Sequence, residues 1–361
     1  MYHLWRTSFP CRAIKILISF MYAFSLVACL SAVNTDYGSP TPIATRQVKS
    51  TEFSLKEYWR LSEPPIIISE NFYTNGEQLI YVGYSAPEIQ LNVVNARNGA
   101  LIWKTDPLPY NGDAVIADTK RIYLLMGSSI HSYNLYSGEL EWKVTGLPMH
   151  TIYNMYVDGN KLIVYSMENS NGNNTIGIVR TYDSKSGLLE NTDNVAFSEN
   201  ATFIFNTSTN NYWSNSNNYW ADSKYIWSVD NRTSLAQWSA PVTGRIQGDP
   251  LLIGNKFIFA SDLFSDVIAL DSKTGKKIWQ YDKKIVSNIA ADSGILYAIR
   301  EDAALVAIDT STGNEIGYLE ISPSFTEESP GSRSISYYVT AAKGIVVVYF
   351  GDSQEIISFS K

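Results

Sequence analysis

The feature that most constrains this chain is a short unit that recurs along it and is complete at Ala269–Trp279. The unit reads as strand, tight turn and strand, because β-branched and apolar residues precede Asp271 and an extended pattern follows Gly275. Gly275 can adopt the left-handed conformation that a bulged hairpin needs, and Asp271 and Thr274 can bond the amides of the turn. The sequence therefore predicts a fold built from repeated β-hairpins.

Five further segments align on this unit, and the turn positions recur every 38 to 49 residues. That period is typical of a propeller blade of four strands. The aligned segments are Val93–Trp103, Ser132–Trp142, Thr181–Asn191, Ser228–Trp238 and Ala307–Gly317. The repeated positions are turn residues and the tryptophan that follows them: Gly99, Trp103, Gly138, Trp142, Asp183, Gly187, Asp230, Trp238, Asp271, Thr274, Gly275, Trp279, Asp309 and Gly313.

A tryptophan held four residues after a glycine turn is expected to pack between blades, with its ring against the turn of the neighbouring blade. The pattern resembles the tryptophan-docking motif of the pyrroloquinoline-quinone-type β-propeller repeat family, and Ala269–Trp279 matches all its fixed positions. Two copies, at 181–191 and 307–317, lack the tryptophan, and Ser234 replaces the glycine in another. We expect weaker contacts between blades at those positions. The resemblance implies an all-β propeller over almost the whole mature chain.

The first and last segments predict how the ring closes. Gly344–Phe350 and Glu355–Lys361 read as two strands, after which a turn and an outermost strand are missing. Ser54–Leu61, with Trp59, looks like that missing strand. We expect it to pair with Glu355–Lys361 and so leave no exposed sheet edges between the first and last blades. Six copies and this composite predict seven four-stranded blades, with six or eight as alternatives.

The first 28 residues predict an export signal. Basic residues precede an apolar run, Ile16–Ala28, that is too short to span a bilayer. The run ends at Leu26–Cys29, which resembles the lipobox of bacterial lipoproteins, where the cysteine carries lipid and becomes the new N-terminus. An ordinary cleavage site beside an incidental cysteine is the alternative.

The lipobox resemblance implies stable attachment to a membrane through lipid on Cys29. Leu30 follows that cysteine, which favours the outer membrane if the cell has one and otherwise the outer face of the plasma membrane. The predicted organisation is therefore a signal peptide at 1–28, a lipidated flexible tether at 29–50 and a propeller domain at 51–361.

Charge and residue inventory restrict the chemistry. Removal of residues 1–28 changes the net charge from −7 to about −10, which argues against a nucleic-acid partner. Cys11 is removed and Cys29 is expected to carry lipid, so no thiol remains for a disulfide, a zinc site or a nucleophile. His131, in a predicted third strand, and His150 lack a third ligand at suitable spacing. We predict no metal, no cofactor and no catalytic residue.

Loop lengths suggest which face binds a partner. Counting from the turns places the first two strands of the fourth blade near Ala201–Asn206 and Asn210–Ser214, followed by a long loop at Asn215–Ser223. The connections near Met167–Thr175 and Ser322–Ser332 are also enlarged. All three are expected to project from one face, and long loops on a rigid scaffold usually carry binding sites.

One stretch in that region has the chemistry of a binding surface. Tyr212, Trp213, Tyr219 and Trp220 alternate with asparagine amides, which suits sugars, peptides or loops of another protein. The alternative is a strand and a solvated loop whose aromatic rings tuck into the blade.

We therefore predict a non-enzymatic, membrane-anchored propeller that binds a protein or an envelope polymer. The resemblance implies a rival, a quinone- or metal-dependent oxidoreductase, although many such enzymes use a vicinal cysteine pair that is absent from this sequence. Cofactor-free proteins with these repeats include lipoprotein scaffold subunits of the outer-membrane β-barrel assembly machinery. This chain resembles them in its lipobox, size and repeats.

Overall fold

The computed structural model describes residues 54–62, 66–85, 87–109, 112–147, 152–170, 174–195, 210–213, 217–221, 225–230, 236–242, 246–261, 266–321, 337–351 and 353–361. The predicted signal peptide, Cys29, the tether, His150, Ala201–Asn206 and the connection Ser322–Ser332 lie outside these residues. Every regular element in the described stretches is a β-strand. No helix there has the length and apolar character needed to cross a membrane.

The described strands form seven hydrogen-bonded sheets, each of which runs from an innermost to an outermost strand. From the inside outward, sheet 1 contains β2 Ile66–Thr74, β3 Gln78–Ser85, β4 Glu88–Asn95 and β5 Leu101–Lys104, with the short β6 Leu108–Pro109 also paired to β4. Sheet 2 contains β7 Gly112–Ala117, β8 Arg121–Met126, β9 Ser129–Asn134 and β10 Leu140–Thr145. Sheet 3 contains β11 Ile152–Asp158, β12 Lys161–Ser170, β13 Asn174–Asp183 and β14 Leu189–Val195.

The remaining sheets follow the same order. Sheet 4 contains β15 Asn210–Trp213, β16 Asn217–Ala221, β17 Tyr225–Asp230 and β18 Ala236–Pro241. Sheet 5 contains β19 Ile246–Ile253, β20 Lys256–Ser261, β21 Val267–Asp271 and β22 Lys277–Tyr281. Sheet 6 contains β23 Ala290–Asp292, β24 Ile295–Ile299, β25 Ala304–Asp309 and β26 Glu315–Glu320. Sheet 7 contains β27 Tyr337–Ala342, β28 Ile345–Phe350, β29 Glu355–Ser360 and, outermost, β1 Lys56–Ser62.

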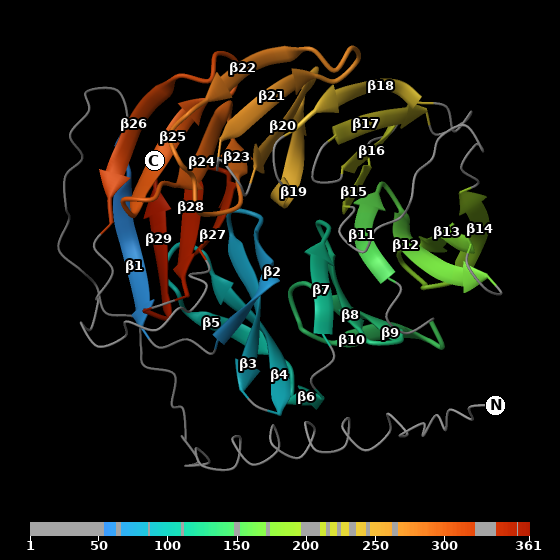
Figure 1. The fold of residues 1–361 in the computed structure, drawn as a ribbon. Helices are drawn as coiled ribbons and strands as arrows, with labels where there is room; N and C mark the ends of the chain where they lie inside the picture. Colours follow the sequence, from blue (N-terminus) through green and yellow to red (C-terminus); the bar gives the residue numbers. More distant parts are fainter. Residues whose placement is uncertain are drawn as a thin grey trace, which may run out of the picture. The chain divides into compact units, whose positions relative to one another are not determined.

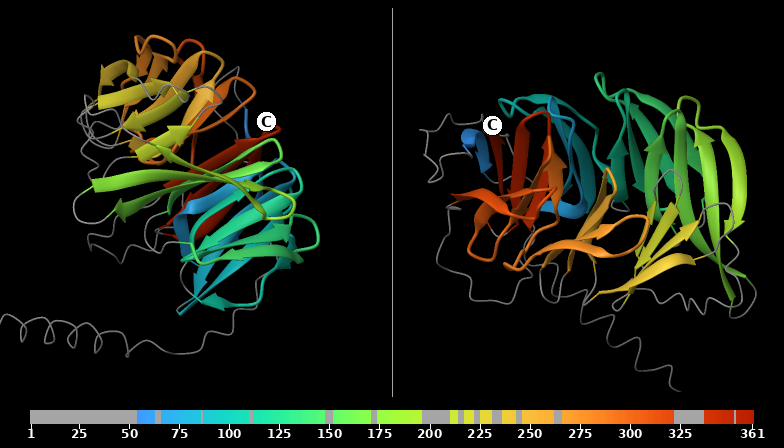
Figure 2. Two further views of the ribbon diagram at one scale, coloured as in Figure 1. Left: turned by 90° about the vertical axis from the view of Figure 1, so that its right-hand side faces the viewer. Right: turned by 90° about the horizontal axis from the view of Figure 1, so that it is seen from above.

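The sheets succeed one another around a ring (Figure 1). The innermost strands of neighbouring sheets are in contact from β27 through β2, β7, β11 and β15 to β19, and β23 contacts β27. Sheets 5 and 6 are joined by a shared hydrophobic cluster. Figure 2 shows the twisted sheets side by side from two further directions. The predicted all-β propeller fold is therefore confirmed.

The hydrophobic core lies between neighbouring sheets. Sheets 6 and 7, for example, bury Tyr297, Leu305, Val348 and Phe359 in one cluster. Both faces of a sheet are covered by its neighbours, so inner strands are apolar along their length, and every residue of β28 is buried. Outer strands such as β22 alternate between exposed and buried residues, since only one side is covered.

The ring closes by pairing the first described strand with the last. β1 runs antiparallel to β29, with Lys56 opposite Ser360. The Arg60 guanidinium lies 3.1 Å from the carboxylate of Glu355, whose side chain is only 2% exposed, so the junction also carries a largely buried ion pair. Trp59 is 2% exposed. The predicted pairing of the N-terminal strand with the C-terminal strands is confirmed.

The prediction for the fourth sheet was wrong in its strand positions. Asn210–Trp213 is the innermost strand rather than the second, and Asn217–Ala221, expected in a long loop, is the second strand. Tyr and Trp favour strands, and Tyr212 pairs directly with Tyr219 across the hairpin. Only residues 214–216 separate the two strands, so the surplus length of this repeat falls before β15.

The expected loop near Met167–Thr175 was also wrong. β12 and β13 stay paired out to Ser170 and Asn174, so the extra residues lengthen a hairpin rather than form a loop. Backbone pairing satisfies the amides of these polar residues within the sheet.

We predict that Trp59→Ala lowers the free energy of unfolding by about 3–5 kcal/mol, because the side chain is buried where the first and last strands join. Tyr58, its neighbour in β1, is 39% exposed, so Tyr58→Ala is the matched control and should cost little. Urea unfolding followed by circular dichroism measures both. Equal effects of the two variants would mean that β1 does not seal the ring.

Candidate functional site

The turn between the third and fourth strands, which we call the outer turn, is built alike in five sheets. Each begins with an aspartate or asparagine whose backbone amide and carbonyl bond the far side of the turn, as Asp271 N–H does with the Lys276 carbonyl at 2.8 Å. The Asp271 carboxylate accepts the Thr274 amide at 2.9 Å. The turn glycines all have positive φ, between 69° and 76°, at Gly99, Gly138, Gly187, Gly275 and Gly313. Glycine is favoured there because other residues are strained in that conformation.

A tryptophan from the preceding sheet covers this glycine. A Cβ placed on Gly138 would lie 2.7 Å from ring atoms of Trp103, and the same approach is seen between Trp142 and Gly187. Trp238 and Gly275 form a third such contact, and Trp279 and Gly313 form a fourth. We call this contact the tryptophan clamp. The clamp favours glycine for two reasons. Glycine adopts the positive φ of the turn without strain, and its lack of a side chain leaves room for the ring.

Each clamp also contains a hydrogen bond. The indole Nε1–H donates to the carbonyl three residues before the glycine, as Trp103 does to Leu135 at 2.9 Å and Trp279 to Thr310 at 3.1 Å. Trp59 of β1 makes the same bond to Ala96 of sheet 1 at 2.9 Å. The closing strand therefore supplies a clamp bond to the outer turn of the next sheet.

The junction between sheets 6 and 7 has no tryptophan clamp. Sheet 6 carries Gly317 at the tryptophan position of β26, and sheet 7 offers no outer turn, because its third and fourth strands are β29 and β1. Other contacts hold this junction: the Asn288 side chain exchanges two hydrogen bonds with the Val339 backbone at 2.8 and 2.9 Å. The Asp292 carboxylate accepts the Gly344 amide at 2.7 Å.

Between sheets 3 and 4 both halves of the clamp are replaced. Asn191 stands at the tryptophan position of β14, and Ser234 stands at the glycine position of the following turn. Asn191 instead donates to Asp193 in its own strand at 2.7 Å. Residues 231–235 lie outside the described part of the chain.

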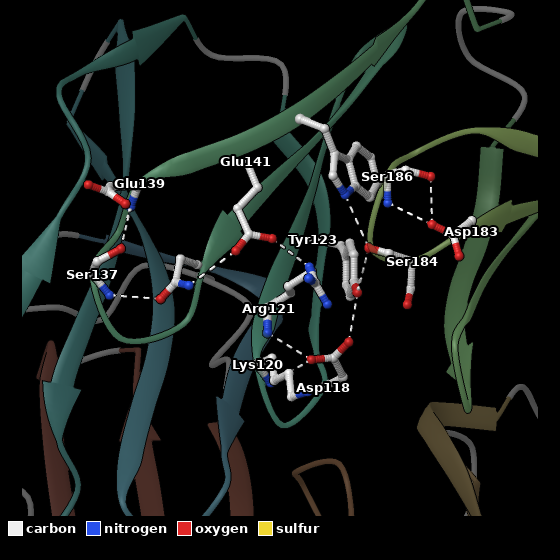
Figure 3. Close-up of polar contacts among 12 residues, drawn as sticks. Asp118, Lys120, Arg121, Tyr123, Ser137, Glu139, Glu141, Asp183, Ser184 and Ser186 are labelled. Carbon is white, nitrogen blue, oxygen red and sulfur yellow. Dashed lines mark hydrogen bonds and ion pairs between the residues drawn. The ribbon is translucent and has the colours of Figure 1, made fainter.

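Polar groups surround the clamp between sheets 2 and 3 (Figure 3). Tyr123 donates its hydroxyl hydrogen to Asp118 at 2.7 Å, and Arg121 pairs with Glu141 at 2.5 Å. Burial, with help from Asp118, raises the pKa of the Tyr123 hydroxyl. Its ring lies 5.7 Å from that of Trp142. These two pairs lie within sheet 2, beside Trp142, and each of these polar groups is engaged by another.

A second polar cluster joins sheets 5 and 6. Tyr281 donates to Glu315 at 2.6 Å, and Lys283 and Arg300 lie 2.9 and 3.3 Å from the same carboxylate oxygen. Burial opposes ionisation of Glu315, but the bonds from Tyr281 and Lys283 outweigh it and lower its pKa. Neither cluster follows from the repeat motif, so sequence analysis missed both.

The predicted position of His131 is confirmed, since it lies in β9, the third strand of sheet 2. Its ring nitrogens approach the hydroxyls of Ser129 and Tyr133, each at 3.2 Å, and burial lowers its pKa. Among the described residues there is no group of three or more His, Cys, Asp or Glu residues that could hold a metal.

The four aromatic residues proposed for binding lie on two strands. Tyr212 and Trp213 are in β15 and Tyr219 and Trp220 are in β16, and the structure brings these strands together as a hairpin at the inner side of sheet 4. Trp220 pairs with Trp227 of β17 in the same sheet. The hairpin is thus part of the scaffold, rather than a loop projecting from it.

Comparison with known proteins agrees with this architecture. Residues 217–360 match the family described as "Outer membrane protein assembly factor BamB". The chain is 28% identical over 137 residues to the protein of that name from Francisella salina, a match that covers 37% of this chain and 23% of the relative. It is 30% identical over 129 residues to the dehydrogenase subunit of a quinone alcohol dehydrogenase from Acetobacter aceti, covering 31% of this chain and 17% of the relative. The chain thus matches less than a quarter of the length of these curated relatives.

The solved structure of BamB from Moraxella catarrhalis has a TM-score of 0.50 and 12% identity to this chain, and the match covers 92% of this chain and 99% of that one. At this identity the likeness concerns the fold alone. The predicted resemblance to quinoprotein-type propeller repeats, and at fold level to the assembly-factor propeller, is confirmed.

We predict that Gly138→Ala destabilises the protein by about 2–4 kcal/mol, because the added methyl group meets the Trp103 ring and the residue keeps a positive φ. Gly254 also has a positive φ, of 60°, but nothing lies within 4 Å of a Cβ placed there. Gly254→Ala is therefore the control and should cost about 1–2 kcal/mol from the backbone alone. Equal losses in urea unfolding would show that the ring contact adds nothing.

The outer turns also predict a pH effect. The Thr274 hydroxyl, with the backbone amides of Thr274 and Lys273, lowers the pKa of Asp271 below its usual 3.8. Its contribution to stability is therefore present above about pH 4 and is lost as pH falls through the lowered pKa. Asn95, at the same position in sheet 1, makes equivalent bonds to the amides of Arg97 and Asn98 without a titrating group.

We expect Asp271→Asn to keep the turn but remove this pH dependence, so the difference from the wild type should shrink as pH is lowered from 7 to 3. The reciprocal variant Asn95→Asp should gain the same dependence. Thermal unfolding across that pH range measures both. A difference that grows toward acid would contradict the assignment.

Proposed function

We propose that this protein is a non-enzymatic propeller, exported and anchored by lipid on Cys29, which holds a partner protein or an envelope polymer outside the cytoplasm. Residues 1–28 act as its signal peptide, 29–50 as its tether and 51–361 as its binding domain. The observation that carries the proposal is the match of residues 217–360 to the assembly-factor family. This likeness supports anchoring in the outer membrane, if the cell has one.

We also propose that each sheet is one blade, so that the ring counts seven blades and the last is completed by β1. A ring of six blades is the alternative. The number of blades sets the spacing of the sheets around the ring.

The partner contact is proposed at the inner hairpin of sheet 4, where Tyr212, Trp213, Tyr219 and Trp220 lie on β15 and β16. Aromatic side chains among asparagine amides supply large contact area and adaptable hydrogen bonds. Tyr225, 45% exposed at the start of β17, offers a matched aromatic control in the same sheet.

The test is co-purification from detergent-extracted envelopes with the lipidated chain as bait. We expect a specific envelope protein or glycan to be retained, and its recovery to fall at least about tenfold when the four aromatic residues are replaced by serine, as for a contact made by hot-spot aromatics. Tyr225→Ser should retain the partner. Recovery of nothing by any form, or equal recovery by all forms, would contradict the proposal. Radiolabelled palmitate in the wild type but not in Cys29→Ala checks the anchor.

The second candidate function is oxidation by a bound quinone, which the partial match to the quinone alcohol dehydrogenase subunit supports. Incubation with pyrroloquinoline quinone and calcium, followed by a dye-linked screen of alcohols and sugars, distinguishes the two. Saturable dye reduction would favour the enzyme, whereas its absence alongside partner retention supports the scaffold.

A further inference from the structure

Exposed apolar residues gather at the outer turns of three consecutive sheets. Two residues after the turn glycine stand Leu101, Leu140 and Leu189, which are 45%, 52% and 54% exposed. The same position in sheets 5 and 6 holds Lys277 and Glu315. The leucines are therefore a property of sheets 1 to 3 and not of the repeat.

The position two residues before the glycine is also distinctive in these sheets. It holds Arg97 in sheet 1, Tyr136 in sheet 2 and Lys185 in sheet 3. Tyr136 is 60% exposed, and further exposed apolar side chains stand at Ile102 and Leu188, which are 43% and 69% exposed. We call Leu101, Ile102, Tyr136, Leu140, Leu188 and Leu189 the apolar rim.

The clamps bring these residues next to one another. Leu101 and Ile102 immediately precede Trp103, whose ring covers Gly138 in the turn that carries Tyr136 and Leu140. Trp142 follows Leu140 by two residues and covers Gly187, which adjoins Leu188. Rim residues of each sheet thus lie close in sequence to a clamp that joins it to the next sheet. Exposed apolar residues gathered in this way mark a surface that contacts something.

Some acidic groups beside the apolar rim are engaged by other groups of the protein, whereas Glu139, next to Leu140, is exposed. Glu141 is paired with Arg121 at 2.5 Å and accepts a hydrogen bond from Asn134 at 3.1 Å. The Asp183 carboxylate accepts the amide of Ser186 at 2.7 Å. The rim therefore combines leucines with Arg97, Tyr136 and Lys185 at its edge, beside the exposed Glu139 and Glu190. Leucine with basic and aromatic neighbours is the residue set that proteins place at a lipid–water interface.

The chain also enters the propeller beside this surface. Outer strands begin at the outer turns, and β1 is the outer strand of sheet 7, with Lys56 opposite the end of β29. Trp59 donates to Ala96 in the outer turn of sheet 1. The described part of the chain therefore begins, at Ser54, on the face that carries Leu101.

We propose that the apolar rim rests on the lipid surface to which the chain is anchored, so that the propeller stands on the edge formed by sheets 1 to 3. The proposal rests on the lipid anchor of the proposed function. A flexible tether of this length has an end-to-end distance of roughly 30 Å, which keeps the rim close to the membrane. Even a contact of six side chains is then favoured, because the anchor makes it intramolecular.

The test uses single cysteines labelled with the environment-sensitive dye NBD. The mature chain has only Cys29, which is expected to carry lipid, so an introduced cysteine is the one free thiol. Ile102→Cys and Leu140→Cys report the rim. Ile278→Cys is the matched control, because Ile278 occupies the position of Ile102 in the repeat of sheet 5 and is 42% exposed.

On vesicles of phosphatidylethanolamine and phosphatidylglycerol that carry the full lipidated chain, we expect the labels at positions 102 and 140 to shift to the blue and brighten about two- to threefold, as for insertion into the acyl boundary. The label at position 278 should not change. If the protein is bound to the vesicles and the fluorescence of the rim labels changes no more than that of the control label, the proposal is overturned. Rim labels that respond only to an added envelope protein or to higher protein concentration would overturn it as well, since the rim would then be a protein interface.

Flotation of the vesicles separates this result from failure of the anchor. If the chain does not float with the vesicles, Cys29 carries no lipid, and the proposed anchoring fails by itself. The same three labels are then compared on a chain held by an N-terminal histidine tag to nickel-chelating lipid, which tests the rim without Cys29. A blue shift confined to the rim labels supports the proposal there too, and its absence overturns it.

Discussion

The contact on which this structure depends is an indole ring lying on a glycine turn of the next sheet. Because the turn residue has positive φ and no side chain, the ring can approach the backbone and its Nε1–H can reach a carbonyl, as Trp103 does over Gly138. One tryptophan therefore fixes both the distance and the angle between two sheets. Repeating the contact turns separate four-stranded sheets into a ring.

At some junctions neighbouring sheets are joined without a tryptophan clamp. Sheet 7 has no outer turn to receive a ring from sheet 6, and there Asn288 and Asp292 bond the backbone of sheet 7 instead. Asn191 and Ser234 replace the two partners of a single contact between sheets 3 and 4, so the losses fall on one junction. The two replacements are expected to occur together, because a turn that no tryptophan ring covers does not need glycine for the ring to approach.

Sequence reasoning reached the parts of the molecule that are local and repeated. The strand–turn–strand unit predicted the outer turns, and the unmatched Trp59 predicted the strand that closes the ring. It failed in sheet 4, because Asn217 and Asn218 suggested a loop although strand pairing satisfies their backbone. Asn288 and the Tyr123–Asp118 pair could not be found this way, because their contacts follow no motif. The sequence indicated which aromatic residues to propose for binding, but they lie in a hairpin of sheet 4 and not in the loop that was expected.

The central claim is that the tryptophan clamp is the contact that couples neighbouring sheets. Its most direct test is to build the contact where it is missing, with Asn191→Trp and Ser234→Gly alone and together, and to measure the free energy of unfolding in urea. We expect the free energy of unfolding of the double variant to exceed the value expected from the sum of the two single changes by a coupling energy of about 1–2 kcal/mol. Additive effects, or a double variant less stable than that sum, would contradict it.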